Sequence, residues 1–242
     1  MNPCIIINTV RAYLAAQLDC APEDLSGSGV LYVPNRTAQP PFVKLAVIGG
    51  RVVVSASPEL LPQVKALTQG RTRDELFELP LVYGQTIHFI PDQVSDMPLP
   101  AGYAYHLLEG EALGQLAGLS GFPNSLAFDE EGHTGTGMVC FAQFQDQIIA
   151  LAGAGEQSQG LWEMGVDTSP SHRGRGLGTA LISWLARELL ARERVPFYSA
   201  SVTNIGSQSV AHRSGLRPCW MDTYSNVLGE DYIYKECIKL VF

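Results

Sequence analysis

The sequence predicts a chain of the α+β (α/β) class on the basis of three observations. Residues 161–202 have the pattern of a strand, a glycine-rich loop, an amphipathic helix and a second strand. Apolar segments at 42–48 and 51–55 flank Gly49-Gly50, the sequence of a tight hairpin turn. Hydrophobic residues make up 46% of the 242 residues and charged residues 17%, enough apolar side chains for a sizeable core. Together these features predict helices packed on a mixed sheet.

The first hundred residues read as a small domain of mixed structure. A helix is expected over 4–19, because Val10, Tyr13, Leu14 and Leu18 fall on one stripe. After the hairpin, we expect helices at 59–68 and 72–78 and a strand at 83–90.

The proline-rich segment 91–100 reads as a linker or domain boundary. We therefore expect an N-terminal α+β domain of unknown role over residues 1–97 and a second domain over residues 98–242. In the second domain we expect a strand at 103–108, a short helix at 111–119, a connector at 121–131, a hairpin of 138–144 and 147–152, and closing strands at 220–227 and 232–240.

The strand–loop–helix–strand unit at 161–202 is the most informative part of the sequence. Short connections make it a parallel crossover, which places the loop at the carboxyl end of the first strand, where open α/β sheets bind ligands. Gly174, Gly176 and Gly178 let the backbone close on a ligand, and the first-turn amides of the helix attract an anion. Arg173 and Arg175 add positive charge to a chain of net charge −8, so the loop predicts a diphosphate site.

Two common diphosphate sites do not fit this loop. No Gly-Lys-Ser/Thr follows the glycines, which disfavours a nucleoside triphosphate P-loop. The glycine order is not G-x-G-x-x-G, and the second strand runs into Ser201-Val-Thr-Asn204 without an acidic residue for a ribose. A dinucleotide fold is therefore disfavoured as well.

The remaining pattern, Arg173-x-x-Gly176-x-Gly178 after a strand and before a helix, closely resembles the GNAT superfamily of N-acetyltransferases over the C-terminal part of the chain. The resemblance implies a mixed, mostly antiparallel sheet with a central pair of parallel strands that splay apart. It also implies acetyl-CoA as co-substrate. The residues that it assigns to acetyl-CoA binding are Gly165, Val166, Arg173, Gly174, Arg175, Gly176, Leu177, Gly178, Thr179, Asn204 and Ser207.

A second matching segment runs from Asn204 to Leu216. It reads as a short helix capped by Thr203 or Asn204 and ended by Gly215 as a left-handed C-cap. By resemblance, its asparagine and helix would line the pantetheine arm. Ala211 stands where many family members carry a tyrosine that protonates the departing thiolate, so the acid is open; His212 is a candidate, against the alternative of an exposed helix histidine.

Glu163 is the candidate general base. Strand alternation places Glu163, Gly165 and Asp167 on one face, and a glycine within a strand often marks close approach by a ligand or another backbone. A backbone N–H near residues 164–166 would polarise the thioester oxygen. The alternative for Glu163 is a solvated or ion-paired strand residue.

Composition limits the partners. With 16 basic and 24 acidic residues the chain lacks the basic footprint of a nucleic-acid binder. Neither a signal peptide nor a membrane span is expected, which predicts a cytoplasmic protein. Five cysteines without C-x-x-C spacing predict neither disulfides nor a metal site.

These features predict an acetyl-CoA-dependent N-acetyltransferase that transfers the acetyl group directly to a small amine in a ternary complex. The N-terminal domain would cover the active site or mediate a homodimer. One alternative is a non-catalytic acyl-CoA-binding sensor, which the alanine at position 211 keeps open. The other is a dinucleotide oxidoreductase.

Overall fold

A computed structural model of the protein describes residues 1–79 and 84–224. The chain divides into two compact units: Met1–Thr9 with His88–Pro218, and Val10–Ile87 with the residues from Cys219 on. Along the chain, the unit changes after Thr9, after Ile87 and after Pro218. The domain boundary expected at 97/98 stays a prediction. The closing strand expected at 232–240, and the end of the one expected at 220–227, lie outside the described residues.

The second unit contains a small sheet in the order β1-β3-β2-β10. The hairpin at Gly49-Gly50 is confirmed, since β2 and β3 pair antiparallel, but β1, which runs parallel to β3, was not expected. The helices expected in this region are confirmed with small shifts of their ends. The elements up to β3 are α1 (Pro3–Leu18), η1 (Pro22–Leu25), β1 (Ser28–Pro34), β2 (Val43–Ile48) and β3 (Gly50–Ala56), followed by α2 (Leu61–Thr68) and α3 (Arg73–Phe77).

The two faces of this sheet carry different helices. Val52 and Val54 on β3 are buried in a cluster with Val64 of α2 and Leu76 of α3. Ser55 alternates with Val54 and therefore points to the other face, where its hydroxyl donates to the carbonyl of Leu18 at the end of α1, at 2.8 Å. The last residues of β10 pair with β2, and Lys44 forms an ion pair with Asp222 at 3.1 Å.

The first unit contains strands in the order β4-β9-β8-β7-β6-β5, which form the mixed sheet that the family resemblance implies. Strands β5 to β8 pair antiparallel with their neighbours, whereas β8 and β9 are parallel. The strands are β4 (Thr86–Pro91), β5 (Ala104–Glu109), β6 (Met138–Phe144), β7 (Gln147–Ser158), β8 (Leu161–Thr168), β9 (Val195–Ser201) and β10 (Leu216–Asp222). The helical elements are η2 (Gly110–Leu116), η3 (Pro170–His172), α4 (Leu177–Ala191) and α5 (Ile205–Arg213).

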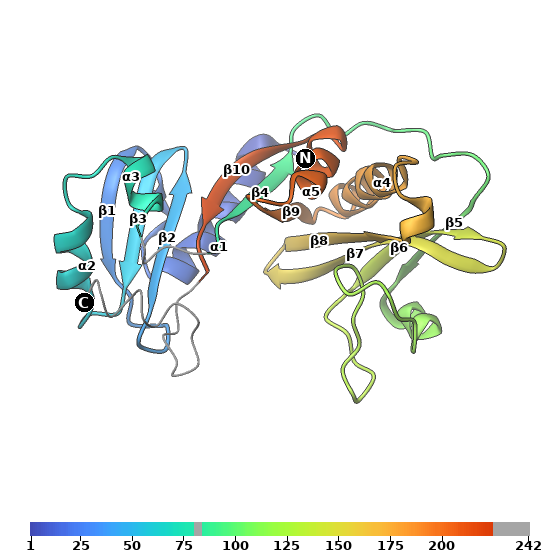
Figure 1. Ribbon diagram of the computed structural model, residues 1–242, viewed down its shortest axis with the longest axis horizontal. Helices are drawn as coiled ribbons and strands as arrows, with labels where there is room; N and C mark the ends of the chain where they lie inside the picture. Colours follow the sequence, from blue (N-terminus) through green and yellow to red (C-terminus); the bar gives the residue numbers. More distant parts are fainter. Residues whose placement is uncertain (80–83, 225–242) are drawn as a thin grey trace. The chain divides into compact units, whose positions relative to one another are not determined.

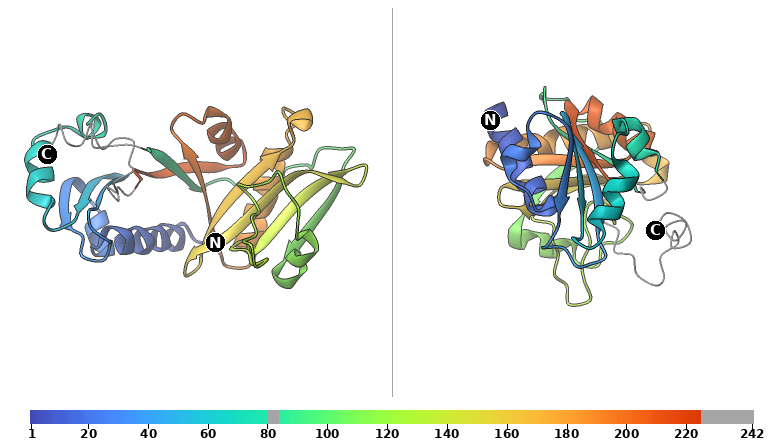
Figure 2. Two further views of the ribbon diagram at one scale, coloured as in Figure 1. Left: turned by 60° about the horizontal axis from the view of Figure 1, so that its bottom comes forward. Right: turned by 90° about the vertical axis from the view of Figure 1, so that its left-hand side faces the viewer.

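Helix α4 covers one face of strands β6–β8, and η2 with the connector that follows it covers the other (Figures 1 and 2). The apolar stripe of α4 is buried as expected, with Leu177, Leu181, Leu185 and Leu189 each at most 2% exposed. The opposite layer contains the short helix expected at 111–119, which is the 3₁₀ helix η2, and the connector after it. It buries Leu113, Leu116, Phe122 and Leu126 against Val139, Phe141 and Leu151 of the sheet.

The segment expected to be a linker, 91–100, is held on the first unit. The hydroxyl of Ser183 donates to the carbonyl of Ser95 at 2.9 Å, and Arg187 forms an ion pair with Asp96 at 2.7 Å. Ser183 is therefore fully buried, although it is a polar residue of an amphipathic helix. Its proline-rich sequence suggested a linker because Ser183 and Arg187, which hold it in place, are about 90 residues away in the sequence.

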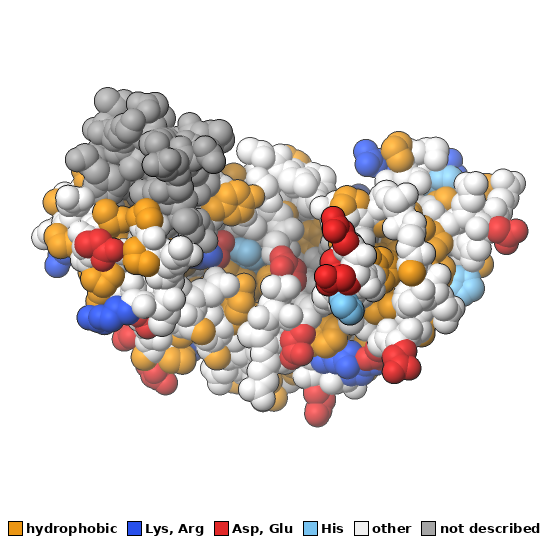
Figure 3. Space-filling view, turned by 90° about the horizontal axis from the view of Figure 1, so that it is seen from below, with side chains coloured by type: hydrophobic (Ala, Val, Ile, Leu, Met, Phe, Trp, Pro, Cys, Tyr) orange, Lys and Arg blue, Asp and Glu red, His pale blue; other side chains and the backbone are white. Residues whose placement is uncertain are grey.

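The surface drawn in Figure 3 carries scattered acidic side chains among hydrophobic and uncharged ones, and in its described part Lys and Arg stand singly or in small groups. Among the described residues, no helix combines the length and the apolar character needed to cross a bilayer.

Candidate functional site

The parallel strands β8 and β9 separate partway along their length. They are paired from Leu161↔Val195 to Met164↔Tyr198, while β8 stays paired with β7 as far as Thr168. Beyond Met164, the edge of β8 that faces β9 is therefore without a β9 partner in the described structure. This separation leaves a gap between the two strands that a ligand can enter.

The loop after β8 shapes the N-terminus of α4. Gly174 and Gly176 have φ angles of 74° and 80°, which side chains rarely allow, and Gly176 is the N-cap of the helix. The amide of Ala180 donates to the carbonyl of Gly176 at 3.0 Å. Because this is the first intrahelical bond, the amides of Leu177, Gly178 and Thr179 have no acceptor within the helix. They form a concentrated donor site at the positive end of the helix dipole.

These amides border a cavity of about 560 Å³, the loop cavity, lined by residues of β8, the loop, α4, β9 and α5 together with Asn124 and Asn204. Arg173 lines it, with Nε anchored on the carbonyl of Thr168 at 3.1 Å, and so does Arg213 of α5. Arg175 does not line it, because its guanidinium donates to the hydroxyl of Tyr103 and the carbonyl of Ser171. The two arginines at this cavity are therefore Arg173 and Arg213, one of which the sequence did not indicate.

Helix α5 closes the other side of the loop cavity. The side chain of Asn204 accepts from the amide of Ser207 at 3.0 Å, so Asn204 is the N-cap, one of the two caps that the sequence left open. Gly215 follows the helix with a φ of 82°. The residues assigned to acetyl-CoA by resemblance that line the loop cavity are Val166, Arg173, Gly174, Gly176, Leu177, Gly178, Thr179, Asn204 and Ser207.

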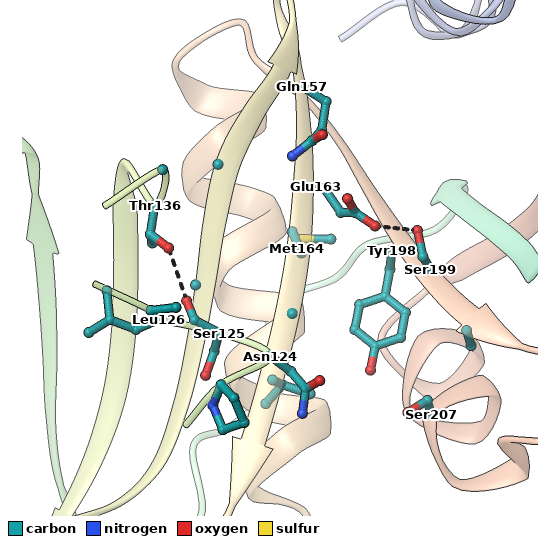
Figure 4. Close-up of a pocket in the computed structure, with 18 of the residues that line it drawn as sticks. Asn124, Ser125, Leu126, Thr136, Gln157, Glu163, Met164, Tyr198, Ser199 and Ser207 are labelled. Carbon is teal, nitrogen blue, oxygen red and sulfur yellow. Dashed lines mark hydrogen bonds between the residues drawn. The ribbon is translucent and has the colours of Figure 1, made fainter. Parts of the chain in front are cut away.

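A second cavity, the strand cavity, has a volume of about 470 Å³ and lies where β8 and β9 separate (Figure 4). Gly165 lines this cavity. The two cavities meet, since they share the lining residues Asn124, Val166, Tyr198, Asn204 and Ser207. A long ligand held in the loop cavity can therefore extend into the strand cavity.

The wall of the strand cavity opposite β9 is a segment that crosses the sheet at a pair of glycines. Gly153 of β7 and Gly165 of β8 are directly opposite each other. A β-carbon on Gly165 would overlap the backbone carbonyl of Asn124, and one on Gly153 would overlap that of Ser125. Both glycines therefore make room for another backbone, the second of the two explanations that a strand glycine leaves open.

Asp167 anchors this crossing segment. Its carboxylate accepts from the amide of Asn124 at 2.9 Å, from the side-chain amide of Asn124 at 2.5 Å and from the hydroxyl of Ser125 at 2.7 Å. Because Gly165 and Asp167 share a face of β8, one strand supplies both the space and the anchor. Nothing local in the sequence indicates this role, since Asn124 and Ser125 are 43 and 42 residues away from Asp167.

Glu163 lies on the same face, in the strand cavity and beyond the crossing segment. It is half-buried, and its Oε1 accepts a hydrogen bond from Ser199 of β9 at 2.5 Å. His88 of β4 lies behind Ser199, with Nδ1 2.9 Å from the serine Oγ. Among the described residues that line the cavity, Glu163 is the one with a charged side chain.

Tyr198 lines both cavities and is 4% exposed. Burial raises the pKa of its phenol, an effect that a hydrogen bond with Ser207 partly offsets. Ala211, at the position where the resemblance leads one to expect a tyrosine, is fully buried. His212 is exposed on α5 and lines neither cavity.

Several lining residues of the loop cavity were not indicated by the sequence, namely Asp167, Thr168, Gly206, Val210 and Arg213, whereas Asn124 lies in the connector expected at 121–131. His172, the residue before Arg173, also lines it. Of these residues, Arg213 had a usable signal, because it is a cation two residues before Gly215 on the helix that the resemblance assigns to the ligand. Away from both cavities, the exposed side chains of Asp129, Glu131 and His133 lie close together, a grouping that is common without a metal.

Residues 119–218 match a protein-family model described as GNAT acetyltransferase. No curated protein matches the chain. Among solved structures, a GNAT-family protein from Novosphingobium aromaticivorans is 23% identical, with 58% of this chain and 63% of that chain covered and a TM-score of 0.44. A GCN5-related N-acetyltransferase from Kribbella flavida is 18% identical (60% and 58% covered, TM-score 0.43).

A GCN5-related N-acetyltransferase-like protein from Streptococcus suis is 16% identical, with 89% of this chain and 98% of that chain covered and a TM-score of 0.47. The chain thus spans less than two thirds of the first two structures, and likenesses this weak carry no inference about activity. The family match covers the separated strands, the glycine loop and both helices of the site. The chain therefore contains a GNAT acetyltransferase domain.

Proposed function

We propose that this domain transfers the acetyl group of acetyl-CoA directly to an amine in a ternary complex. The observation that supports this most strongly is the joining of two cavities, one bordered by free helix amides and two arginines, the other containing a single carboxylate. The loop cavity is suited to bind an anion, and the strand cavity is suited to a group that must lose a proton.

The residues of the loop cavity fit the diphosphate of a coenzyme. The amides of Leu177, Gly178 and Thr179 point their N–H groups at the helix entrance, and Arg173 and Arg213 supply positive charge. Acetyl-CoA, when bound, would supply an acetyl thioester. Its pantetheine arm would pass Asn204 and Ser207 toward the junction of the cavities.

In the strand cavity, Glu163 takes the proton that the amine loses as its nitrogen forms a bond with the acetyl carbon. An unpaired N–H on the open edge of β8 polarises the carbonyl oxygen. Tyr198 gives its phenol proton to the sulfur as the carbon–sulfur bond breaks, and regains a proton from solvent. A raised pKa suits this donor, because the phenol stays protonated across the physiological pH range.

Replacement of Tyr198 by phenylalanine is expected to lower kcat about tenfold, a moderate loss because a thiolate is already a fair leaving group. His212→Ala should leave kcat within about twofold of the wild-type value, since that side chain lines neither cavity. Steady-state thiol release measures both. The reverse order of effects would return the acid role to His212.

The location of Tyr198 also favours an enzyme over a non-catalytic sensor. Ala211 kept the sensor alternative open, but a phenol from a different element reaches the junction of the cavities. Nothing in the described site favours a dinucleotide oxidoreductase.

We further propose that the acceptor amine has no carboxylate beside it. The described lining of the strand cavity offers hydroxyl and amide groups, including Ser199, Ser201, Gln157 and Thr136, and none of these described residues is Lys, Arg or His. An acceptor carboxylate would meet no cation there and would face Glu163, at a cost in desolvation and repulsion.

The test is thiol release from acetyl-CoA with matched pairs of acceptors: cadaverine and lysine, agmatine and arginine, tyramine and tyrosine. We expect at least one amine to be acetylated, with kcat/KM about tenfold or more above that of its amino acid. Absence of transfer to every acceptor would contradict the proposed function. Preference for the amino acids would contradict only the proposed acceptor class.

A further inference from the structure

We propose that Ser199 and His88 are positioning residues that hold Glu163 in the orientation needed to take a proton from the acceptor. This role rests on the proposed function, because it assumes that Glu163 is the base. The three side chains form one hydrogen-bonded chain, from His88 Nδ1 to Ser199 Oγ at 2.9 Å and from Ser199 Oγ to Glu163 Oε1 at 2.5 Å. They come from β4, β9 and β8, which are adjacent in the sheet.

Counting protons fixes the direction of this chain. A carboxylate only accepts, so the single hydroxyl proton of Ser199 is donated to Glu163. Ser199 Oγ must then act as the acceptor toward His88, which requires a proton on His88 Nδ1. The geometry therefore assigns His88 a protonated Nδ1, whereas an isolated neutral imidazole can carry its proton on either ring nitrogen.

His88 is well placed to hold Ser199. It is 9% exposed, and its ring packs against Phe197, with 6.0 Å between the ring centroids. Ser199, in contrast, lines the strand cavity. A buried, packed imidazole thus fixes a hydroxyl that is itself close to the ligand, and the hydroxyl fixes the base.

The two carboxylate oxygens of Glu163 have different surroundings. Oε1 is directed at Ser199 (Figure 4), and no hydrogen bond in the described part of the chain engages Oε2. Oε2 is therefore the atom that takes the acceptor proton, directly or through water. Without Ser199 the carboxylate would sample other rotamers, and fewer encounters would have the reacting atoms aligned.

The first test compares Ser199→Ala with Ser199→Thr. We expect the alanine variant to lose about tenfold in kcat, the size of one hydrogen bond to a charged group, with KM for both substrates within about twofold. The threonine variant keeps the hydroxyl and should stay within about threefold of wild type. Equal losses in the two variants, or a loss confined to KM, would overturn the role.

The second test asks whether Ser199 acts through Glu163. In the Glu163→Gln background, Ser199→Ala should cause no further loss of kcat, because there is no carboxylate left to orient. A second tenfold loss there would show that Ser199 acts on something else. His88→Phe, which keeps an aromatic ring against Phe197, should lower kcat in the same way as Ser199→Ala, and His88→Asn, which keeps a donor, should lower it less.

The third test does not depend on turnover. Nitrogen NMR of the ¹⁵N-histidine-labelled protein, with His88→Phe to assign the signals, should show a protonated Nδ1 on His88. A bare Nδ1 would overturn the chain as described. A protonated Nδ1 without transfer to any amine would overturn both the proposed function and the positioning role. Transfer that is insensitive to Ser199 would overturn the positioning role alone.

Discussion

Glu163→Gln is expected to lower kcat about 10²- to 10⁴-fold, the usual contribution of a positioned general base. Glutamine preserves the size of the side chain and can still accept from Ser199, but it cannot take a proton from an ammonium or amine. Because the substitution leaves the loop cavity untouched, the Kd for acetyl-CoA should change by less than about threefold. The measurements are steady-state thiol release and calorimetric titration.

Glu156→Gln is a matched control, since Glu156 is an exposed glutamate on β7 and lines neither cavity. Its kcat should remain within about twofold of wild type. Unchanged turnover in Glu163→Gln would remove Glu163 as base and leave it as an ion-paired or solvated strand residue. A large rise in the Kd for acetyl-CoA would instead place the carboxylate in coenzyme binding.

Gly165→Ala is expected to destabilise the domain by about 1–3 kcal/mol and to abolish most of its activity. The added methyl group would overlap the backbone carbonyl of Asn124, which cannot move aside as the end of a flexible side chain could. Displacing this segment strains the three hydrogen bonds that Asp167 accepts from Asn124 and Ser125. Because the same segment forms a wall of both cavities, stability and turnover should fall together.

Gly114→Ala provides the control. Gly114 is exposed, its φ is not positive, and a β-carbon there would meet no atom within 4 Å. Urea unfolding should give this variant a free energy of unfolding within about 0.5 kcal/mol of wild type. Equal stability of the two glycine variants would mean that the crossing segment does not lie over Gly165.

The sequence predicted the parts of this fold that are encoded locally. The loop at Gly174 and Gly176, the apolar stripe of α4 and the cap at Asn204 each depend on residues within a few positions of one another. The family resemblance added the splayed strands, and the pairing of β8 and β9 confirms that they separate. Strand β1 was missed because its segment is short, begins with Ser28-Gly29, ends at Pro34 and carries no strict alternation.

The features that could not be predicted all depend on tertiary contacts. Nothing near Asp167 in the sequence indicates that it anchors Asn124 and Ser125, and nothing near Glu163 indicates Ser199 and His88. The two arginines of the loop looked equivalent in the sequence. The fold separates them, because the chain turns Arg175 toward Tyr103, away from the loop cavity.

That separation gives the most direct test of the central claim, that the entrance of α4 binds the diphosphate of the coenzyme. The measurement is the Kd for CoA, by calorimetry, in the wild type, Arg173→Ala and Arg175→Ala. We predict that Arg173→Ala weakens binding about tenfold or more, as loss of a charge-assisted hydrogen bond does, and that Arg175→Ala changes it less than about threefold. Equal affinity in Arg173→Ala and wild type, or a larger loss in Arg175→Ala, would contradict the account.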